Sequence, residues 1–410
     1  MAEKVSRRKW LKYTAAGIVV AGVAAAGGAY YYGIQKPARE EIKIGFTIDQ
    51  TSPLAAGAEA QWNSYILWSE QKNAEGGLYV KDLGKKLPIR LIFYDDKSDP
   101  ATAVKYYERL ITEDKVDLLV PPYGTFMHFG IVPTVEKYHM TVVGNTASGL
   151  KAKEFGAKYF FFPYPFPDKM MAAVVDLLKK YQNTVKTVSI INLQDTLLIE
   201  CRSFLVPLLE QAGFNIVYLK DYPFGLTDMT AILLEAKSTN ADAFIGLTYP
   251  DDAFLATQQS IQLGLNAKFF FALLGPVITG YREKFGEKTE GISSFALWSP
   301  KLATPGTKEF YEAYVKRFNK EPDYGGSSSG WATMQTMEKA IEIAGTLDNE
   351  RLREVIASTE FSTVCGKEKF DGIENIYNWS TVLQWQSGIN EIVAPEDRKT
   401  ANLWMPKPPF

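Results

Sequence analysis

Cysteine and histidine, the residues that most often bind metals or act as nucleophile and base, are nearly absent from this sequence. Its 410 residues include only Cys201, Cys365, His128 and His139 of these two types. No Cys-x-x-Cys pair occurs, which excludes the usual zinc and haem frameworks. In an oxidising compartment the two cysteines either form a disulfide or remain as separate buried thiols, and the second alternative is the simpler one. We therefore expect neither a metal centre nor a cofactor.

An excess of basic residues is also lacking. The sequence has 45 Lys and Arg against 47 Asp and Glu, and its first 33 residues contain five of the basic and one of the acidic residues. The remainder therefore carries 40 basic and 46 acidic residues, a net charge of about −6. Proteins that bind nucleic acid concentrate Lys and Arg to neutralise phosphates. This charge balance argues against nucleic acid as a partner.

One long apolar run is present near the N-terminus, at Thr14–Tyr32, and Ser6-Arg7-Arg8-Lys9-Trp10-Leu11-Lys12 precedes it. This pattern is typical of a twin-arginine signal, which directs the export of a folded protein. Residues 24–26, all alanine, provide a cleavage site. The run is also long enough to stay as an anchor, since helical residues rise about 1.5 Å each and a bilayer core is about 30 Å thick. We expect residues 1–33 to be a signal or an anchor, and the protein to act outside the cytoplasm in either case.

After this segment, short β-branched or aromatic runs alternate with stretches of helical period. Such alternation is typical of parallel sheets covered by helices on both faces. It occurs in two series, which predicts an α/β fold of two doubly wound parallel-sheet lobes. The first series of expected strands is Ile42–Ile48, Ile89–Asp95, Val116–Val120 and Met140–Gly144. The second is Thr187–Leu193, Phe214–Leu219, Asp242–Leu247 and Lys268–Leu273. The expected helices include Ala101–Glu113, Leu198–Ala212 and Asp252–Leu263.

We expect the chain to cross between the lobes several times, as in a multi-crossing hinge. Prolines interrupt residues 160–168, which predicts a crossing there and no helix. A second crossing is expected near Pro300 and Pro305, and the chain returns to the second lobe through Phe361–Gly366.

The crossings define the expected domains. Helices predicted at Thr307–Phe318 and Gly330–Ala344 are assigned back to the first lobe. The first lobe then comprises residues 42–163 and 300–360, and the second comprises 164–299 and 361–410, including a strand-like Thr381–Trp385.

A set of short motifs in the expected order and spacing carries a resemblance to a known family. The motifs are Ile44-Gly45 to Pro53, Asn73-Ala74-Glu75-Gly76-Gly77, Tyr94-Asp95-Asp96, Asp99-Pro100 to Ala103, and Asp114-Lys115-Val116-Asp117. Together they resemble the branched-chain, leucine-type amino acid periplasmic binding proteins, most strongly over residues 42–148. The resemblance implies a type I periplasmic binding protein, monomeric, that closes on a small solute and delivers it to the membrane permease of an ABC importer.

Two loops of the first lobe are the expected solute-binding loops. In open parallel sheets, ligands lie beyond the carboxyl ends of the strands, next to helix N-termini that present free N–H groups. The loops after Val120 and Val143 meet both conditions and resemble the Ser/Thr-bearing ligand loops of the family. Their candidate ligand-binding residues are Tyr123, Gly124, Thr125, Phe126, Thr146, Ala147 and Ser148. The alternative is that the hydroxyl groups only cap their own helices.

In the second lobe, Tyr249 follows an expected strand and matches the aromatic closure residue of the family in position and spacing. Trp62, near the start of the first helix, is a further candidate that fits an apolar or aromatic solute, with ordinary helix packing as the alternative.

Two departures from the family pattern concern the solute. Leu197 and Leu198 stand where such receptors have a tyrosine, and Leu273 and Leu274 stand near the position of the glutamate that receives the ligand's ammonium. A buried ammonium without an acceptor is costly. Either another acid, such as Asp195 or Asp251, receives it, or the solute has no amine. A hydrophobic amino acid is the first expectation and an aromatic or aliphatic carboxylate the second.

Enzyme functions have little support. Gly326-Ser327-Ser328-Ser329-Gly330 fits the Gly-x-Ser-x-Gly pattern of a nucleophile elbow, but it lacks a buried strand before it and a histidine after it. We interpret these residues as a helix N-terminus. Asp95 and Asp96 are expected to hold nearby loops and not to bind a metal. The alternatives to a transport receptor are a sensor ectodomain with a separate signalling partner and, with least support, an exported hydrolase.

Overall fold

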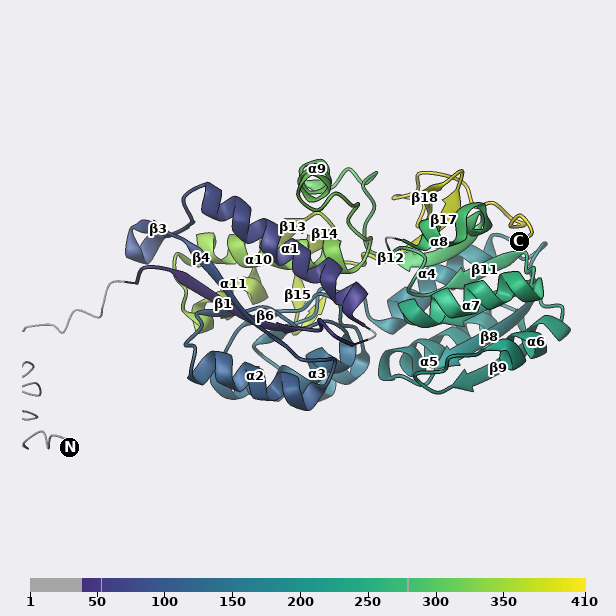
Figure 1. Cartoon of the computed structure of the whole chain (residues 1–410), viewed down its shortest axis with the longest axis horizontal. Helices are drawn as coiled ribbons and strands as arrows, with labels where there is room; N and C mark the ends of the chain where they lie inside the picture. Colours follow the sequence, from purple (N-terminus) through teal and green to yellow (C-terminus); the bar gives the residue numbers. More distant parts are fainter. Residues whose placement is uncertain (1–38, 53, 279) are drawn as a thin grey trace, which may run out of the picture. The chain divides into compact units, whose positions relative to one another are not determined.

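Parallel strand pairing organises the computed structural model, which describes residues 39–52, 54–278 and 280–410 (Figure 1). Glu40–Phe410 forms one compact unit. The predicted twin-arginine signal at residues 6–12 and the apolar run at 14–32 lie outside the described residues. Among the helices that are described, none combines the length and the hydropathy of a bilayer span.

The first sheet contains three parallel strands in the order β4-β1-β5. β1 (Ile42–Ile48) and β4 (Ile89–Asp95) have the predicted bounds, whereas β5 (Leu118–Leu119) is shorter than predicted. Helices α1 (Ala55–Ala74) and α10 (Gly326–Ala344) lie on one side of β1, and α2 (Pro100–Thr112) and α3 (Thr125–Tyr138) on the other (Figure 1). We call this sheet and the helices against it the first lobe.

Next to the first sheet, β6 (Val142–Val143) and β7 (Phe160–Phe161) form a separate parallel pair. Residues 160–168, predicted to be only a crossing, therefore contain a strand, and helix α4 (Pro167–Lys179) begins among them. Proline at the start of this helix is tolerated. It lacks a backbone N–H, but the N–H groups of the first helical turn have no partner within the helix in any case.

The second sheet has seven strands in the order β18-β17-β12-β11-β10-β8-β9. β9, β8, β10, β11 and β12 are parallel, and β17 and β18 extend the sheet as antiparallel strands. The bounds are β8 (Thr187–Leu193), β9 (Asn215–Tyr222), β10 (Ala243–Leu247), β11 (Phe269–Ala272), β12 (Ile292–Ala296), β17 (Thr381–Gln386) and β18 (Ile389–Ala394). β12 and β18 were not predicted.

Paired helices cover this sheet and complete the second lobe. α4 packs against α5 (Thr196–Gln211), and α6 (Thr230–Ser238) packs against α7 (Pro250–Leu263). The short α8 (Tyr281–Phe285) lies between β11 and β12 in the chain. Two α/β lobes with parallel sheets are the predicted fold class.

Three segments connect the lobes: residues 162–166, 297–306 and 359–380, which we call the first, second and third crossings. Helices α9 (Thr307–Phe318) and α11 (Asn349–Ser358) flank α10 in the chain. The third crossing contains β13 (Phe361–Thr363), β14 (Gly366–Glu368), β15 (Phe370–Asp371) and β16 (Glu374–Asn375). β13 packs against α10 and β15 against α11, so these strands lie with first-lobe helices, whereas the predicted boundary assigns residues from 361 to the second lobe. A hairpin of β2 (Leu78–Val80) and β3 (Lys85–Leu87) completes the strands of the described residues.

Close packing of α10 on α1 explains the glycine- and serine-rich start of α10. A Cβ atom on Gly330 would lie 3.0 Å from the carbonyl oxygen of Gln61, and Ser64 Oγ donates to the carbonyl of Ser327 at 2.7 Å. The helix begins at Gly326, four residues before the predicted Gly330. The interpretation of Gly326–Gly330 as a helix N-terminus is confirmed.

The adjacent acids Asp95 and Asp96 and the two cysteines lie outside the site and have structural roles. Asp95 accepts hydrogen bonds from Thr51 Oγ1 and the Gln50 N–H, and Asp96 accepts one from Thr47 Oγ1 at 2.6 Å, so both hold strand ends as expected. Cys201 and Cys365 are free and buried. Of the two alternatives for the cysteines, the structure has separate thiols.

A single guanidinium links two of the crossings. Arg398, which follows β18, donates from Nη1 to the carbonyl of Trp379 at 2.8 Å. Its Nη2 donates to the carbonyls of Leu297 and Cys365, each at 3.1 Å. Leu297 belongs to the second crossing, and Cys365 and Trp379 belong to the third. Because hydrogen bonds from a charged donor are stronger than neutral ones, this residue fixes the relative position of the two crossings.

We expect Arg398→Ala to lower the free energy of unfolding by about 3 kcal/mol, because three carbonyl groups lose a charged donor. Denaturant unfolding followed by circular dichroism measures this. The matched control is Arg351→Ala, which removes an exposed i,i+3 pair with Glu354 and should cost less than about 1 kcal/mol. Equal effects of the two substitutions would show that Arg398 does not link the crossings.

A buried acid lies in the third crossing. Glu368 is fully buried, and its Oε2 accepts a hydrogen bond from Thr336 Oγ1 of α10 at 2.7 Å. Within the described residues its Oε1 has no partner. Burial raises the pKa of Glu368 to about 8, and the hydrogen bond from Thr336 only partly opposes this. The folded protein therefore holds this carboxyl in its neutral form over most of the physiological pH range.

Because the pKa of Glu368 is higher in the folded than in the unfolded chain, its contribution to stability is complete below pH 4.5 and is lost as the pH rises to about 8. Each unit of pKa difference corresponds to about 1.4 kcal/mol. As the pH rises from 5 to 8, we expect the free energy of unfolding to fall by several kcal/mol less in Glu368→Gln than in the parent protein. Urea unfolding at both pH values measures the difference, and parallel pH profiles would contradict the assignment.

Candidate functional site

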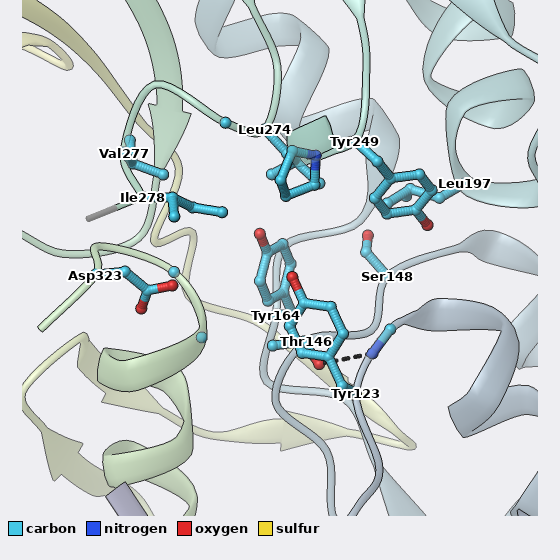
Figure 2. Close-up of a pocket in the computed structure, with 15 residues that line it drawn as sticks. Tyr123, Thr146, Ser148, Tyr164, Leu197, Tyr249, Leu274, Val277, Ile278 and Asp323 are labelled. Carbon is cyan, nitrogen blue, oxygen red and sulfur yellow. Dashed lines mark hydrogen bonds between the residues drawn. The ribbon is translucent and has the colours of Figure 1, made fainter. Parts of the chain in front are cut away.

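A cavity of about 50 Å³ lies where loops from both lobes meet (Figure 2). One water molecule needs roughly 10–15 Å³ of such space, so the cavity has room for a small solute. Most of its lining comes from loops that follow the carboxyl ends of β5, β6, β8, β10 and β11. The lining residues are Tyr123, Gly124, Thr146, Ser148, Tyr164, Leu197, Tyr249, Pro250, Leu274, Gly275, Val277, Ile278, Asp323, Gly325 and Gly326.

Five of the residues predicted from the sequence line this cavity. They are Tyr123, Gly124, Thr146, Ser148 and Tyr249. Residues that follow different strands thus meet in one place, because the carboxyl ends of parallel strands lie at the same edge of a sheet.

Three other predicted residues support the lining without being part of it. Thr125 Oγ1 accepts a hydrogen bond from the Ser148 N–H at 3.2 Å, and Ala147 is buried between the two lining hydroxyl residues. Asp195 Oδ1 accepts hydrogen bonds from Tyr249 Oη at 3.0 Å and from the Leu197 N–H at 2.9 Å. Asp195 thus fixes the ring of Tyr249.

Trp62, Phe126 and Leu273 are not part of the lining. The Trp62 ring packs against Phe93, with 5.1 Å between ring centroids, which is the alternative of ordinary helix packing. Phe126 packs against the hydrophobic core beside α3, and Leu273 is fully buried in the main core. Leu274 faces the cavity in place of Leu273, since successive side chains at a strand end point to opposite sides.

Gln61 of α1 connects the two first-lobe loops. Its Nε2 donates to the carbonyls of Pro121 and Pro122 at 3.1 and 3.0 Å. Its Oε1 accepts a hydrogen bond from Thr146 Oγ1 at 2.8 Å, and Thr146 Oγ1 in turn accepts one from the Gly124 N–H at 3.0 Å. The hydroxyl group of Thr146 is therefore used to join the loops, and it caps no helix.

His128 also connects the two first-lobe loops. Its Nδ1 lies 2.8 Å from the carbonyl oxygen of Gly124, and its Nε2 accepts a hydrogen bond from the Asn145 N–H at 3.4 Å. Burial lowers the pKa of His128 to about 4, so the imidazole is neutral and can accept this bond. Ser148 Oγ donates to the carbonyl of Pro165, which ties the loop to the first crossing.

Helix α3 presents an uncapped N-terminus at the cavity. Its N-cap residue is Gly124, with φ +89°, a conformation that glycine adopts without strain. Among the described residues, no side-chain hydrogen bond caps the first turn of this helix. The first N–H groups of a helix have no partner within the helix and favour an anion.

Two phenol groups point into the same space (Figure 2). In the part of the chain that the structure describes, the hydroxyls of Tyr123 and Tyr164 have no hydrogen-bond partner; the Tyr164 side chain is buried and that of Tyr123 is partly buried. Burial raises the pKa of both, so they remain neutral donors. A Cβ atom on Gly57 would lie 2.4 Å from the Tyr123 hydroxyl oxygen, so glycine at position 57 is what allows the ring to lie there.

Asp323 supplies the carboxylate of the cavity lining. It lies just before α10, where its Oδ1 accepts a hydrogen bond from the Ser327 N–H and its own N–H donates to Ser327 Oγ at 3.2 Å. The side chain is 4% exposed. Burial raises the pKa of Asp323, and hydrogen bonds from Ser327 and from the backbone of Gly325 and Gly326 oppose the shift.

Four lining residues, Tyr164, Val277, Ile278 and Asp323, were not predicted from the sequence. Tyr164 lies among the prolines of the first crossing and was taken only as a connector. A signal for Asp323 was present, since an Asp shortly before a helix start is a preferred capping residue. The acids that were considered instead, Asp195 and Asp251, do not line the cavity.

In the described ranges, no group of three or more His, Cys, Asp or Glu side chains is placed to hold a metal ion.

Comparisons with known proteins agree with this architecture. Residues 41–378 match the family model described as periplasmic binding protein. The chain is 22% identical to Leu/Ile/Val-binding protein homolog 7 of Brucella suis over 402 residues, which cover 90% of this chain and 96% of that protein.

Two solved structures have the same fold. The branched-chain amino acid substrate-binding protein LivJ of Streptococcus pneumoniae, in complex with isoleucine, has a TM-score of 0.75 at 20% identity, covering 87% of this chain and 100% of that one. An ABC transporter solute-binding protein of Rhodopseudomonas palustris, in complex with benzoate, has a TM-score of 0.75 at 16% identity, covering 90% and 97%.

Proposed function

Because the chain belongs to the periplasmic binding protein family, we propose that it is the solute-binding receptor of an ABC importer. The observation that carries this proposal is the cavity whose lining comes from both lobes. A solute held there contacts both lobes only when they are close together, so its binding energy stabilises the closed arrangement. The partner is then a membrane permease that recognises this closed form. The receptor acts as a monomer without a catalytic role.

The solute is small, largely apolar and carries a carboxylate. Leu197, Leu274, Val277 and Ile278 form the apolar part of the lining. The uncapped N-terminus of α3 at Gly124 suits the carboxylate, because helix N-termini favour anions. The names and ligands of the related proteins include branched-chain amino acids and benzoate, and both classes fit this description.

The proposal extends to location and movement. The twin-arginine pattern at residues 6–12 supports export to the outer side of the membrane, with residues 14–32 either removed or kept as an anchor. The two lobes move as units about the three crossings, and the strands β13 and β15 of the third crossing, which were predicted to belong to the second lobe, move with the first-lobe helices that they contact.

A screen of hydrophobic amino acids, aromatic acids and short aliphatic acids tests the receptor function. A solute at 100 times its dissociation constant should stabilise the protein by about 2.7 kcal/mol, which raises the temperature of thermal unfolding. The same solute should reduce the radius of gyration in X-ray scattering. Stabilisation without compaction by any bound solute would contradict closure, and no stabilisation by any compound would contradict the receptor function.

We expect Tyr249→Ala to weaken solute binding at least tenfold. Removal of a packed aromatic side chain from a binding site typically costs about 2 kcal/mol or more, and about 1.4 kcal/mol is tenfold in affinity. Isothermal titration calorimetry measures the change. The matched control is Tyr79→Ala, which removes a tyrosine that is 51% exposed on β2 and should leave the affinity unchanged. A change of less than threefold in the Tyr249 variant would argue against its role as a closure residue.

A further inference from the structure

The charge of the cavity lining is unbalanced. Among the described residues that line it, Asp323 is the only acid, and none is Lys, Arg or His. A solute carboxylate therefore finds no cationic side chain in the lining, and only backbone N–H groups and neutral hydroxyls can receive it. The only ordinarily charged side chain in the described lining is thus an acid.

Asp323 is held in place and faces the cavity. Its bonds with Ser327 at the start of α10 fix the side chain, because the Ser327 N–H donates to Oδ1 while Ser327 Oγ accepts from the Asp323 N–H. Figure 2 shows its carboxylate at one side of the cavity, with the phenol groups of Tyr123 and Tyr164 beside the same space. These bonds leave acceptor capacity on the carboxylate, because an ionised carboxylate has about four lone-pair positions.

Among the described residues, no cationic side chain forms an ion pair or a hydrogen bond with Asp323. Its charge acts on the phenol groups of Tyr123, Tyr164 and Tyr314, whose pKa values are raised so that they stay neutral. A buried charge is costly unless it is paired. An anionic solute without an amine would bring a second negative charge into this cavity, whereas a solute with an ammonium group would bring the missing partner.

From this arrangement we infer that Asp323 receives a cationic nitrogen of the solute, so that the cavity selects amine-bearing carboxylates over carboxylates of the same carbon skeleton without the amine. The inference rests on the proposed receptor function and decides between the two solute classes that it leaves open. The carboxylate of the solute lies at the N-terminus of α3 and the ammonium at Asp323, and the apolar residues surround the rest of the molecule.

Matched pairs of solutes test the inference on the unmodified protein. L-leucine with 4-methylpentanoate, and L-phenylalanine with 3-phenylpropanoate, differ within each pair only in the amino group. Calorimetric titration should give at least tenfold tighter binding for the amino acid of whichever pair the cavity accommodates. Equal or tighter binding of the acid without the amine would overturn the inference and leave the receptor function intact. If no member of either pair binds, the inference fails together with the choice of these solutes.

The Asp323→Asn variant tests the residue itself. Asparagine keeps the shape and an oxygen that accepts from Ser327, so the start of α10 is preserved, which thermal unfolding of the ligand-free variant checks. We expect at least tenfold weaker binding of the amino acid and less than a threefold change for any binding of its amine-free partner. Asp176→Asn is the control, because Asp176 is exposed on α4, pairs with Lys179 and is not part of the cavity lining, and it should change neither. An equal loss for both solutes in the Asp323 variant would indicate a structural role and overturn the inference.

Discussion

Parallel strand pairing is the constraint on which the site depends. The strands that lead to the site pair in parallel in each lobe, so the loops after β5 and β6 and the loops after β8, β10 and β11 emerge at carboxyl-end edges. A loop at such an edge is followed by a helix N-terminus with unpaired N–H groups. The cavity forms where these edges of the two lobes meet, and its ability to receive an anion follows from backbone geometry before any side chain is considered.

The parts of the fold that could be predicted from the sequence are those in which burial dictates residue type. β1 and β8 have their predicted bounds because each is an almost fully buried run rich in β-branched residues. β4 also has its predicted bounds although Ile89 is its only buried residue, because its β-branched and aromatic residues favour a strand. The start of α10 was placed four residues too late, because glycine and serine have low helix propensity and the tight contact with α1 that requires them is a tertiary feature. β12 and the four short strands of the third crossing were missed, since two- to five-residue strands give little periodic signal.

For the site, prediction succeeded where a residue follows a recognisable strand. Tyr123, Gly124, Thr146, Ser148 and Tyr249 all do so, and all line the cavity. Tyr164 reaches it from the first crossing and Asp323 from the segment between α9 and α10, and nothing in the sequence indicates that they belong with the ligand loops. The hydroxyl of Thr146 was expected to face a solute, but its bonds to Gln61 and Gly124 show that it also joins the two loops. A role of this kind depends on contacts in three dimensions, which cannot be read from a single sequence.

The position of Arg398 in the chain has a consequence for how the protein is made. The carbonyls of Leu297, Cys365 and Trp379 accept hydrogen bonds from Arg398, which lies 19 to 101 residues later in the chain. The first lobe also needs α10, whose residues come long after those of β1. The connection between the crossings therefore cannot be complete before Arg398 has been synthesised and has left the ribosome. A nascent chain can form local helices and strands earlier, but the link between the two crossings forms later than the elements it joins.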